Sequence, residues 1–150
     1  MRVFRNLTFK LASGPERTEA IRLRKELYQE ELGYHGSDEF DDDAHQLIAV
    51  DEDGQIVGAI RILDPLQRPF EIERFVNIES ILGDNRTPGQ IGGFWIRTAD
   101  RRVQGGAFLP LGMLKVAFMF ARKRGITDFV MRTHVGALQR FYERGLFRLV

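Results

Sequence analysis

The chain has 150 residues, of which 43% are hydrophobic and 29% charged, and this composition fits one globular domain with one core. Lys and Arg number 22 against 21 Asp and Glu, so the formal charge of +1 provides no general attraction for nucleic acid, and any anion site has to be local. The sequence contains no cysteine, which excludes disulfides, zinc–thiolate sites and thiol nucleophiles.

The sequence has no targeting or membrane-spanning pattern. Charged residues interrupt the apolar run of the N-terminal MRVFRNLTFKLAS, which is not typical of a signal peptide. No apolar stretch reaches the roughly 18 residues that a transmembrane helix needs. We therefore expect a soluble, cytoplasmic protein that binds neither a membrane nor nucleic acid.

Local signals mark the first strand and the first helix. Residues 7–12 alternate apolar and polar side chains, which predicts a strand. The tetrapeptide SGPE at 13–16 then supplies an N-cap serine, a proline in the first turn and a capping-box glutamate. We expect the helix to run to about Leu32, because Gly33 can end it.

The acidic run at 37–43 is expected to form a loop, and two β-type runs follow it. They occupy residues 46–50 and 55–63 and are separated by Asp-Glu-Asp-Gly at 51–54. A glycine-containing turn between two such runs predicts a β-hairpin.

Residues 65–97 are expected to form a loop and then a strand. Residues 65–88 hold three of the five prolines and predict mostly loop. Residues 90–97 read as a buried strand, whose adjacent glycines allow a bulge or a close backbone approach.

A helix is predicted over 109–124, with a basic last turn and a stop at Gly125. The apolar residues at helical spacing are Leu111, Leu114, Phe118 and Ala121. Further along, we expect a strand over 127–133, a helix over 137–144 and a last strand over 146–150. This order of elements, without an internal repeat or a linker, predicts a single mixed α/β (α+β) domain over 1–150.

The segment RRVQGGA at 101–107 lies between the predicted strand and the predicted helix. Backbone N–H groups at the start of a helix lack internal partners and carry partial positive charge, so they bind phosphate groups, and glycines let the backbone approach closely. The patterns GxGxxG and GxxxxGK[ST] are absent, which argues against hydride transfer and nucleotide hydrolysis. The segment is either a phosphate-binding loop or an ordinary glycine turn.

The pattern Arg-x-x-Gly-x-Ala at 102–107 resembles the loop that binds the phosphopantetheine pyrophosphate in the GNAT acyltransferase superfamily. Residues 138–147, LQRFYERGLF, resemble a late helix of that superfamily, although Leu146 separates the usual Gly-Phe pair. The stretches IRLRKELYQEELGY, DEFD and VGAIRIL are similar to the acyl-homoserine-lactone (autoinducer) synthases and the N-acyl amino acid synthases, which form one branch of the superfamily.

This resemblance implies a GNAT-like domain with a mixed, mostly antiparallel, twisted sheet flanked by helices. It implies transfer of an acyl group from an acyl-CoA or an acyl carrier protein to the amine of a small molecule such as an amino acid derivative, without a metal. Members of the branch usually continue for another strand or two past the position of Val150. The last part of the sheet would then be absent, or supplied by a partner such as a second copy in a homodimer.

The resemblance also implies how the donor is held and attacked. A backbone N–H of the strand would polarise the thioester carbonyl, and the glycine-rich loop would hold the pyrophosphate. The donor-binding residues would be Phe94, Trp95, Ile96, Arg101, Arg102, Val103, Gln104, Gly105, Gly106 and Ala107. Tyr142 would protonate the leaving thiolate. The amine proton would go, directly or through water, to one of the carboxylates Asp38, Asp41 and Glu73.

On the acceptor side, the resemblance implies four residues, whose arginines would orient a carboxylate of the substrate. They are Arg24, Tyr28, Tyr34 and Arg61. The branch also carries Glu-x-x-Arg on the strand before the loop, where this chain has Gln90-Ile-Gly-Gly93. The segment Glu71-Ile-Glu-Arg74 has the right spacing, but it lies well before that strand.

Structural interpretations stay open for several of these residues. The acidic run could be a solvated loop, Arg24 with Tyr28 a surface pair, and Tyr142 a packing residue. Trp95 fits a core position. Three histidines are too scattered in the sequence to predict a metal site, namely His35, His45 and His134.

The function likewise has two interpretations. The chain is either an N-acyltransferase or a catalytically silent relative that binds an acyl thioester or a protein partner, and the missing Glu-x-x-Arg favours the second. A carrier-protein donor would need a basic landing patch, although a basic last helical turn also complements the helix dipole. The candidates for the patch are Arg101, Arg102, Lys115, Arg122, Lys123 and Arg124.

Overall fold

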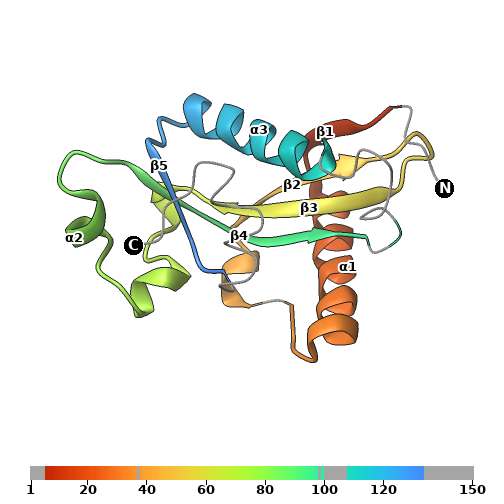
Figure 1. The fold of residues 1–150 in the computed structure, drawn as a ribbon, viewed down its shortest axis with the longest axis horizontal. Helices are drawn as coiled ribbons and strands as arrows, with labels where there is room; N and C mark the ends of the chain where they lie inside the picture. The colour runs from red at the N-terminus through yellow and green to blue at the C-terminus, as the bar shows by residue number, and fades with distance from the viewer. Residues whose placement is uncertain (1–5, 37, 98, 100–107, 134–150) are drawn as a thin grey trace.

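The computed structural model describes residues 6–36, 38–97, 99 and 108–133, which form a five-stranded sheet with helices packed against it (Figure 1). The strands lie side by side in chain order. They are β1 (Thr8–Leu11), β2 (His45–Val50), β3 (Ile56–Leu63), β4 (Pro88–Ile96) and β5 (Asp128–Met131). β1 to β4 pair antiparallel and β5 joins β4 in parallel, which confirms the mixed, mostly antiparallel sheet. The helix expected at 137–144 and the strand expected at 146–150 lie outside the described residues.

The first helix and the hairpin follow their local signals. Helix α1 (Gly14–Leu32) begins after Ser13, whose backbone N–H donates to the Glu16 carboxylate at 2.9 Å. Gly33 ends the helix with a φ of 70°, a left-handed conformation that glycine adopts without strain. β2 and β3 form the expected hairpin, so these sequence predictions are confirmed.

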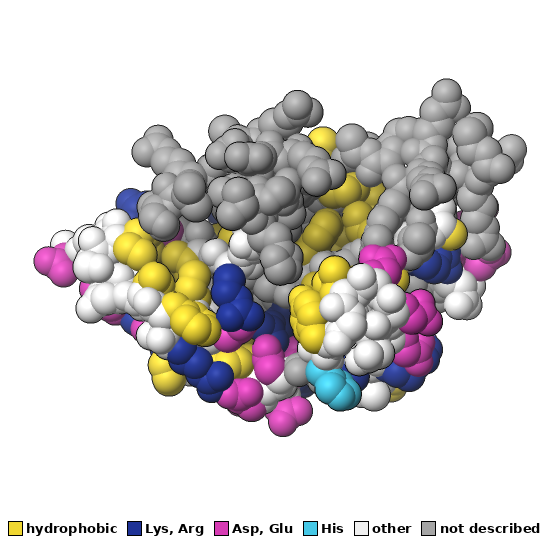
Figure 2. Space-filling view, turned by 60° about the horizontal axis from the view of Figure 1, so that its bottom comes forward, with side chains coloured by type: hydrophobic (Ala, Val, Ile, Leu, Met, Phe, Trp, Pro, Cys, Tyr) yellow, Lys and Arg dark blue, Asp and Glu magenta, His cyan; other side chains and the backbone are white. Residues whose placement is uncertain are grey.

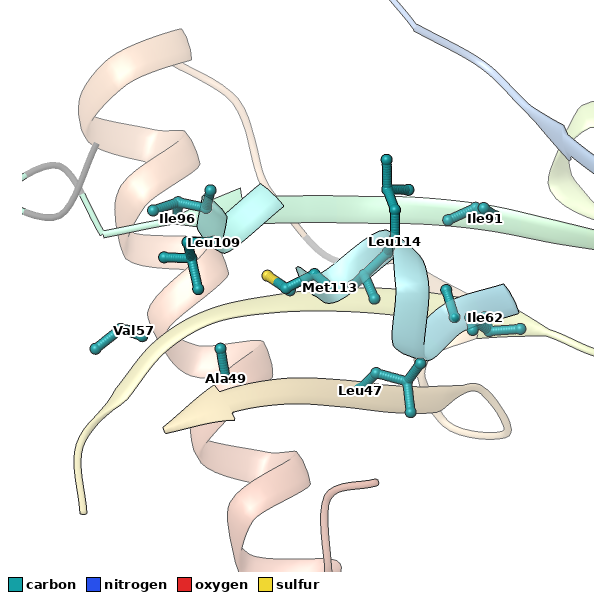
Figure 3. Packing of buried hydrophobic residues seen from close by; sticks show 11 residues of the cluster. Leu47, Ala49, Val57, Ile62, Ile91, Ile96, Leu109, Met113 and Leu114 are labelled. Atoms are coloured by element: carbon teal, nitrogen blue, oxygen red, sulfur yellow. The ribbon is translucent and has the colours of Figure 1, made fainter. Parts of the chain in front are cut away.

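One face of the sheet packs against helix α3 (Phe108–Lys123) through an apolar core (Figure 3). Leu47, Ile62 and Ile91 come from three neighbouring strands, and Met113 and Leu114 of α3 belong to the same buried cluster. The remaining buried members of this core are Ala49, Val57, Ile60, Ile96, Leu109 and Ala117.

The four apolar residues that recur at helical spacing in α3 do not share one environment. Leu114 and Ala121 are buried, but Leu111 and Phe118 are exposed. Because α3 is apolar on most of its circumference, helical spacing alone does not select the face that meets the sheet. Even so, no helix in the described part of the chain is long and apolar enough to cross a membrane.

The opposite face of the sheet meets α1 through a smaller apolar cluster and a set of buried polar side chains. Trp95 packs with Ala20, Ile48 and Ala59, which confirms its predicted core position. The buried polar residues on or beside this face are Arg24, Asp41, Gln46, Arg61 and Gln90. Side chains alternate along a strand, and so Arg61 points to this face while its neighbours in β3 point to the apolar core.

The segment 65–88 contains more helix than the expected loop. It forms 3₁₀ turns at Pro65–Gln67 and Glu71–Arg74 and the short helix α2 (Ile78–Leu82). Asp64 and Asn77 cap two of these elements by accepting backbone N–H groups at 2.9 Å. Pro65 is the first residue of its 3₁₀ turn, Pro69 lies between the two turns and Pro88 begins β4, so no proline interrupts these short elements.

β4 carries the bulge that its two glycines allow. Ala59 pairs with Trp95 and Arg61 with Gly92, so Gly93 and Phe94 together stand opposite a single residue of β3. Gly93 has a φ of 54°, which favours glycine. β5 accompanies β4 only from Pro88 to Ile91 and then runs away from it (Figure 1). The bulge therefore lies beyond the point where β4 and β5 separate.

Candidate active site

Asp41 is the centre of a buried cluster of charges on the α1 side of the sheet. It is 4% exposed, and its Oδ1 accepts from Arg24 Nη2 at 2.5 Å and from Arg61 Nη1 at 3.3 Å. Arg61 Nη1 also donates to Asp38 Oδ1 at 2.5 Å. The acidic run is therefore not a purely solvated loop, because two of its carboxylates bind arginines from α1 and β3.

The spacing of the two aspartates explains how the acidic run folds. Asp38 accepts the N–H of Phe40 at 3.0 Å, and Asp41 accepts the N–H of Asp38 at 3.1 Å. These bonds close the 3₁₀ turn Glu39–Asp41 and leave one oxygen of Asp41 for the arginines. Carboxylates three residues apart thus serve both as caps and as ion-pair partners.

Arg24 is held from the segment that follows α1. It is 1% exposed, and its Nε donates to the carbonyl of Gly36 while Nη2 binds Asp41. Gly36 packs so closely on α1 that an added Cβ would lie 3.0 Å from the Cβ of Tyr28. A glycine is needed at this position for the chain to return across the helix.

The adjacent glycines of β4 make room for the two arginine side chains. A Cβ on Gly92 would lie 3.4 Å from Nη2 of Arg61, and a Cβ on Gly93 would lie 3.0 Å from Cζ of Arg24. The two guanidinium groups therefore lie over neighbouring residues of the strand. Burial opposes the charge on Arg61, but Asp38 and Asp41 outweigh it, so the pKa of Arg61 is raised above its ordinary value.

Glu71 is a further member of the cluster, which the sequence analysis did not assign to the site. Its Oε2 lies 3.2 Å from Arg61 Nη2 and accepts from Gln90 Nε2 at 3.4 Å. Its Oε1 lies 2.7 Å from Arg132, which directly follows β5. Glu71 thus connects β3, β4 and the end of β5. The signal that could have identified it is the Glu-x-x-Arg spacing that begins at this residue.

Glu73, the proton acceptor expected from this segment, points elsewhere. In a 3₁₀ turn of about three residues per turn, side chains two positions apart face different directions. Glu73 accordingly pairs with Arg68, and this arginine, together with the N–H of Phe70, holds its pKa below the usual value against the effect of burial. Arg74 pairs with Glu39. Neither Glu73 nor Arg74 therefore joins the Asp41 cluster.

Exposed ion pairs surround the buried ones. On the side of the molecule seen in Figure 2, Lys and Arg side chains are interspersed with Asp and Glu. Such pairs contribute little to stability, because solvent screens them. Accessibility decides which carboxylate of the cluster a substrate can reach, and the side chains of Asp38 and Glu71 are 32% and 16% exposed. That of Asp41 is only 6% exposed.

Tyr28 and Tyr34 lie beside the arginine cluster. The Tyr28 hydroxyl donates to the backbone carbonyl of Phe94 at 2.9 Å. The two tyrosine rings meet edge to face with centroids 5.5 Å apart, and Tyr34 is largely exposed. The interpretation of Arg24 and Tyr28 as a surface pair is wrong, because both side chains reach inward to β4.

The donor side of the site is only partly described. Arg97 donates its N–H to Val57 of β3 at 2.9 Å, and strand alternation then directs the N–H of Ile96 away from β3. The N–H of Ile96 thus points to the edge of β4 where β5 lies, at a position beyond the end of the β4–β5 pairing. The loop 101–107 and Tyr142 lie outside the described residues.

The remaining candidates are placed as follows. Lys115, Arg122 and Lys123 are exposed on α3, and Arg124 lies 3.3 Å from Asp64. His45 also binds Asp64, at 2.9 Å. Within residues 6–36, 38–97, 99 and 108–133, no group of three or more histidines and carboxylates is arranged to hold a metal ion. His134 is not among these residues.

Several acyltransferases of known structure have this fold. FeeM, an N-acyl amino acid synthase from uncultured soil microbes, aligns over 91% of this chain and 76% of its own with a TM-score of 0.75 and 13% identity. The AHL synthase LasI aligns over 93% and 78% with a TM-score of 0.71 and 16% identity. A predicted acetyltransferase from Clostridium acetobutylicum, solved with acetyl-CoA, aligns over 97% and 92% with a TM-score of 0.63 and 18% identity.

No protein-family model and no curated protein sequence matches the chain. The structural matches have low sequence identity, and what they establish is the fold. It is the GNAT-like fold expected from the sequence, and the two synthases share it.

Proposed function

We propose that the chain is an N-acyltransferase that moves an acyl group from a CoA or carrier-protein thioester to the amine of a small molecule such as an amino acid derivative. The observation that carries this proposal is the bulge at Gly93 and Phe94, placed beyond the end of the β4–β5 pairing and beside a charged cluster. The fold shared with an N-acyl amino acid synthase, and a structural neighbour solved with acetyl-CoA, support the same chemistry.

The donor would lie where β4 and β5 separate. A backbone N–H within 94–96, for which the N–H of Ile96 has the required direction, would stabilise the negative charge that develops on the thioester carbonyl oxygen. The loop 102–107, at the start of α3, would hold the pyrophosphate of the donor. This strand–loop–helix arrangement fixes the thioester relative to the attacking amine, which is the main requirement of a direct transfer.

The transfer itself needs one nucleophile, one base and one acid. The amine nitrogen attacks the thioester carbonyl carbon and forms the C–N bond, and the C–S bond then breaks. The amine proton passes to a carboxylate, for which Asp38 and Glu71 are more accessible than Asp41. Tyr142 would return a proton to the departing thiolate. No covalent enzyme intermediate is required, in keeping with a chain that has no cysteine.

A catalytically silent acyl-thioester-binding protein is the second candidate. The observation that favours it is the strand sequence Gln90-Ile-Gly-Gly93, which lacks both charges of the synthase motif. Glu71 brings a carboxylate next to Gln90, and the Arg24 guanidinium occupies the space over Gly93. The charges of this region are therefore supplied from other segments, which supports the active enzyme.

Thermal unfolding in the presence of donors tests the proposal. A ligand at 100 times its Kd stabilises the folded state by about 2.7 kcal/mol. We expect acetyl-CoA, a long-chain acyl-CoA or acyl carrier protein to raise the Tm, and an unrelated nucleotide to leave it unchanged. Release of thiol in the presence of amino acid amines would then separate the enzyme from the silent binder.

The variant Arg102→Glu tests the donor loop directly. We expect it to abolish the donor-induced shift while leaving the Tm of the unliganded protein nearly unchanged, because it removes an anion contact rather than core packing. Lys25→Glu changes the net charge equally on the exposed side of α1 and serves as the control. Equal donor shifts in both variants would contradict the loop assignment.

A further inference from the structure

Arg24 and Tyr28 lie one turn apart on α1, and their side chains meet β4 at consecutive residues. Residues four apart on a helix lie on the same face. Arg24 lies against Gly93, and the Tyr28 hydroxyl bonds the carbonyl of Phe94 at 2.9 Å. These two residues of β4 form the bulge. One face of α1 therefore contacts the part of the strand where regular pairing is interrupted.

The contact of Arg24 with the bulge depends on the absence of a side chain at Gly93. An added Cβ would lie 3.0 Å from Cζ and 3.3 Å from Cδ of Arg24. Arg24 itself cannot easily move away, because Nε is bound to Gly36 and Nη2 to Asp41. Its remaining terminal nitrogen, Nη1, is buried without a hydrogen-bond partner. The guanidinium is thus a fixed support under the bulge.

Tyr28 fixes the direction of the next peptide. The carbonyl of Phe94 and the N–H of Trp95 belong to one planar peptide unit, so the bond to the Tyr28 hydroxyl orients both groups. A bulge has fewer ladder bonds than a regular strand, and it needs such outside contacts to keep one conformation. The backbone that follows is the segment assigned to the thioester carbonyl.

We propose that Arg24 and Tyr28 are positioning residues, which hold the β4 bulge so that the backbone N–H of Ile96, which points away from β3, is aligned with the donor carbonyl. This inference rests on the proposed function. It replaces the acceptor-binding role that the family resemblance implied for both residues. At 1% exposure, and with two of its three nitrogens engaged within the protein, Arg24 offers an acceptor no accessible surface.

The inference makes a different kinetic prediction from acceptor binding. Loss of alignment weakens an interaction that forms mainly in the transition state, and therefore lowers kcat with little change in KM. We expect Tyr28→Phe and Arg24→Lys to lower kcat by roughly tenfold or more, because a single well-placed backbone donor contributes about 10²–10³-fold. A role in acceptor binding would instead raise the KM for the amine.

The first measurement uses the protein without substrate. Amide hydrogen exchange at 93–96 is compared in wild type and Tyr28→Phe. Loss of one hydrogen bond should speed exchange there by about five- to tenfold. Thr18→Val is the matched control, since it removes from the same helix a hydroxyl that donates to the carbonyl of Gly14. Unchanged exchange at the bulge in Tyr28→Phe would overturn the inference.

The second measurement tests how strongly the protein polarises the donor carbonyl. The C=O stretching frequency of acyl-CoA labelled at the thioester carbonyl is recorded when bound to wild type, Tyr28→Phe, Arg24→Lys and the exposed control Arg22→Lys. We expect the frequency to fall on binding to wild type and Arg22→Lys, and to fall less in the other two variants at unchanged affinity. Equal frequencies in all four proteins would overturn the inference but leave the proposed function intact.

The two proposals fail in different ways. If neither acyl-CoA nor acyl carrier protein binds the wild type, the proposed function is wrong, and the inference falls with it. If the donor binds and the variants change only the KM for the amine, the proposed function stands, and Arg24 and Tyr28 are acceptor-binding residues. The inference is supported only when exchange, carbonyl frequency and kcat change together.

Discussion

The two faces of the sheet are built from the same strands but from opposite chemistry. In β3, Ile60 and Ile62 point to α3 and join a core of aliphatic side chains, whereas Arg61 between them points to the α1 side and joins Asp38, Asp41 and Glu71. Strand alternation alone separates the two environments. One face excludes water through apolar packing, and the other holds buried charges in fixed geometry.

The difference indicates what each face contributes. Apolar burial supplies most of the stability of a domain of this size. Buried ion pairs contribute little net stability, because desolvation costs about as much as the attraction returns. We therefore assign stability mainly to the α3 face and backbone positioning to the α1 face. The predictions below test that division, beginning with the largest expected effect.

Replacement of Asp41 should have the largest effect. Asp41→Asn leaves Arg24 and Arg61 buried with less compensating charge, and breaking a buried pair in this way costs about 3–5 kcal/mol. We expect urea denaturation to show this loss in the free energy of unfolding. Asp38→Asn is the control, because its side chain is 32% exposed, and solvent limits the cost to about 1 kcal/mol. Equal losses of stability in both variants would contradict the expectation that buried Asp41 matters more than the partly exposed Asp38.

A cavity on the α3 face of the sheet should lower the stability of the fold without a separate effect on the β4 bulge. Ile62 is fully buried, and Ile62→Ala should lower the free energy of unfolding by about 3 kcal/mol through lost burial and an unfilled cavity. Amide exchange at 93–96 should change only as far as global stability does. Leu66→Ala, at a side chain that is 89% exposed, should change stability by less than about 0.5 kcal/mol. A selective effect of Ile62→Ala on the bulge would show that the two faces are not separable.

The two adjacent glycines should respond differently to alanine. Gly93→Ala places a Cβ against Arg24 at a φ of 54°, and the left-handed conformation alone costs about 1–2 kcal/mol. Gly92→Ala meets Arg61 only at 3.4 Å, and the flexible end of that side chain can adjust. We expect Gly93→Ala to lose about 2 kcal/mol and Gly92→Ala less than about 1 kcal/mol in urea denaturation. A larger loss in Gly92→Ala would contradict the placement of Arg24.

The exposed pair between Arg86 and Asp128, at the start of β5, should have the smallest effect. The Arg86 guanidinium holds the pKa of Asp128 below its ordinary value, although burial opposes the shift. A depressed carboxyl pKa stabilises the fold at pH above the unfolded-state value, and the stabilisation is lost as pH falls through the folded-state value. Asp128→Asn should therefore cost about 0.5 kcal/mol at pH 7, and the difference from wild type should shrink below about pH 4. A pH-independent difference would mean that the carboxylate charge is not responsible.

Sequence reasoning was most successful where the signal is local. The capping residues of α1, its glycine stop, the β2–β3 hairpin and the bulge of β4 all depend on residues within a few positions of one another. Arg24, Arg61, Asp38 and Asp41, which family resemblance named as site residues, form ion pairs with one another in the structure, and their roles in the reaction remain predictions. The donor loop and Tyr142 remain predictions.

The features that the sequence left undetermined depend on contacts between distant segments. The orientation of α3 depends on which of its apolar stripes meets the sheet, and α3 is apolar on most sides. That Glu71 rather than Glu73 contacts Arg61 depends on the direction of a short 3₁₀ turn relative to β3. The Asp38–Asp43 run looks like a surface loop until Arg24 and Arg61, from two other elements, are placed beside it.

The sequence by itself determined where α1 begins and ends and where the β2–β3 hairpin turns, because capping, alternation and glycine conformation act over a few residues. Only the tertiary structure decided that Arg24 supports Gly93, that Tyr28 binds the Phe94 carbonyl and that Asp41 is buried between two arginines. Each of these contacts joins residues more than a dozen positions apart, and only the packing of α1 and of the 3₁₀ turn Glu39–Asp41 against the sheet brings them within reach.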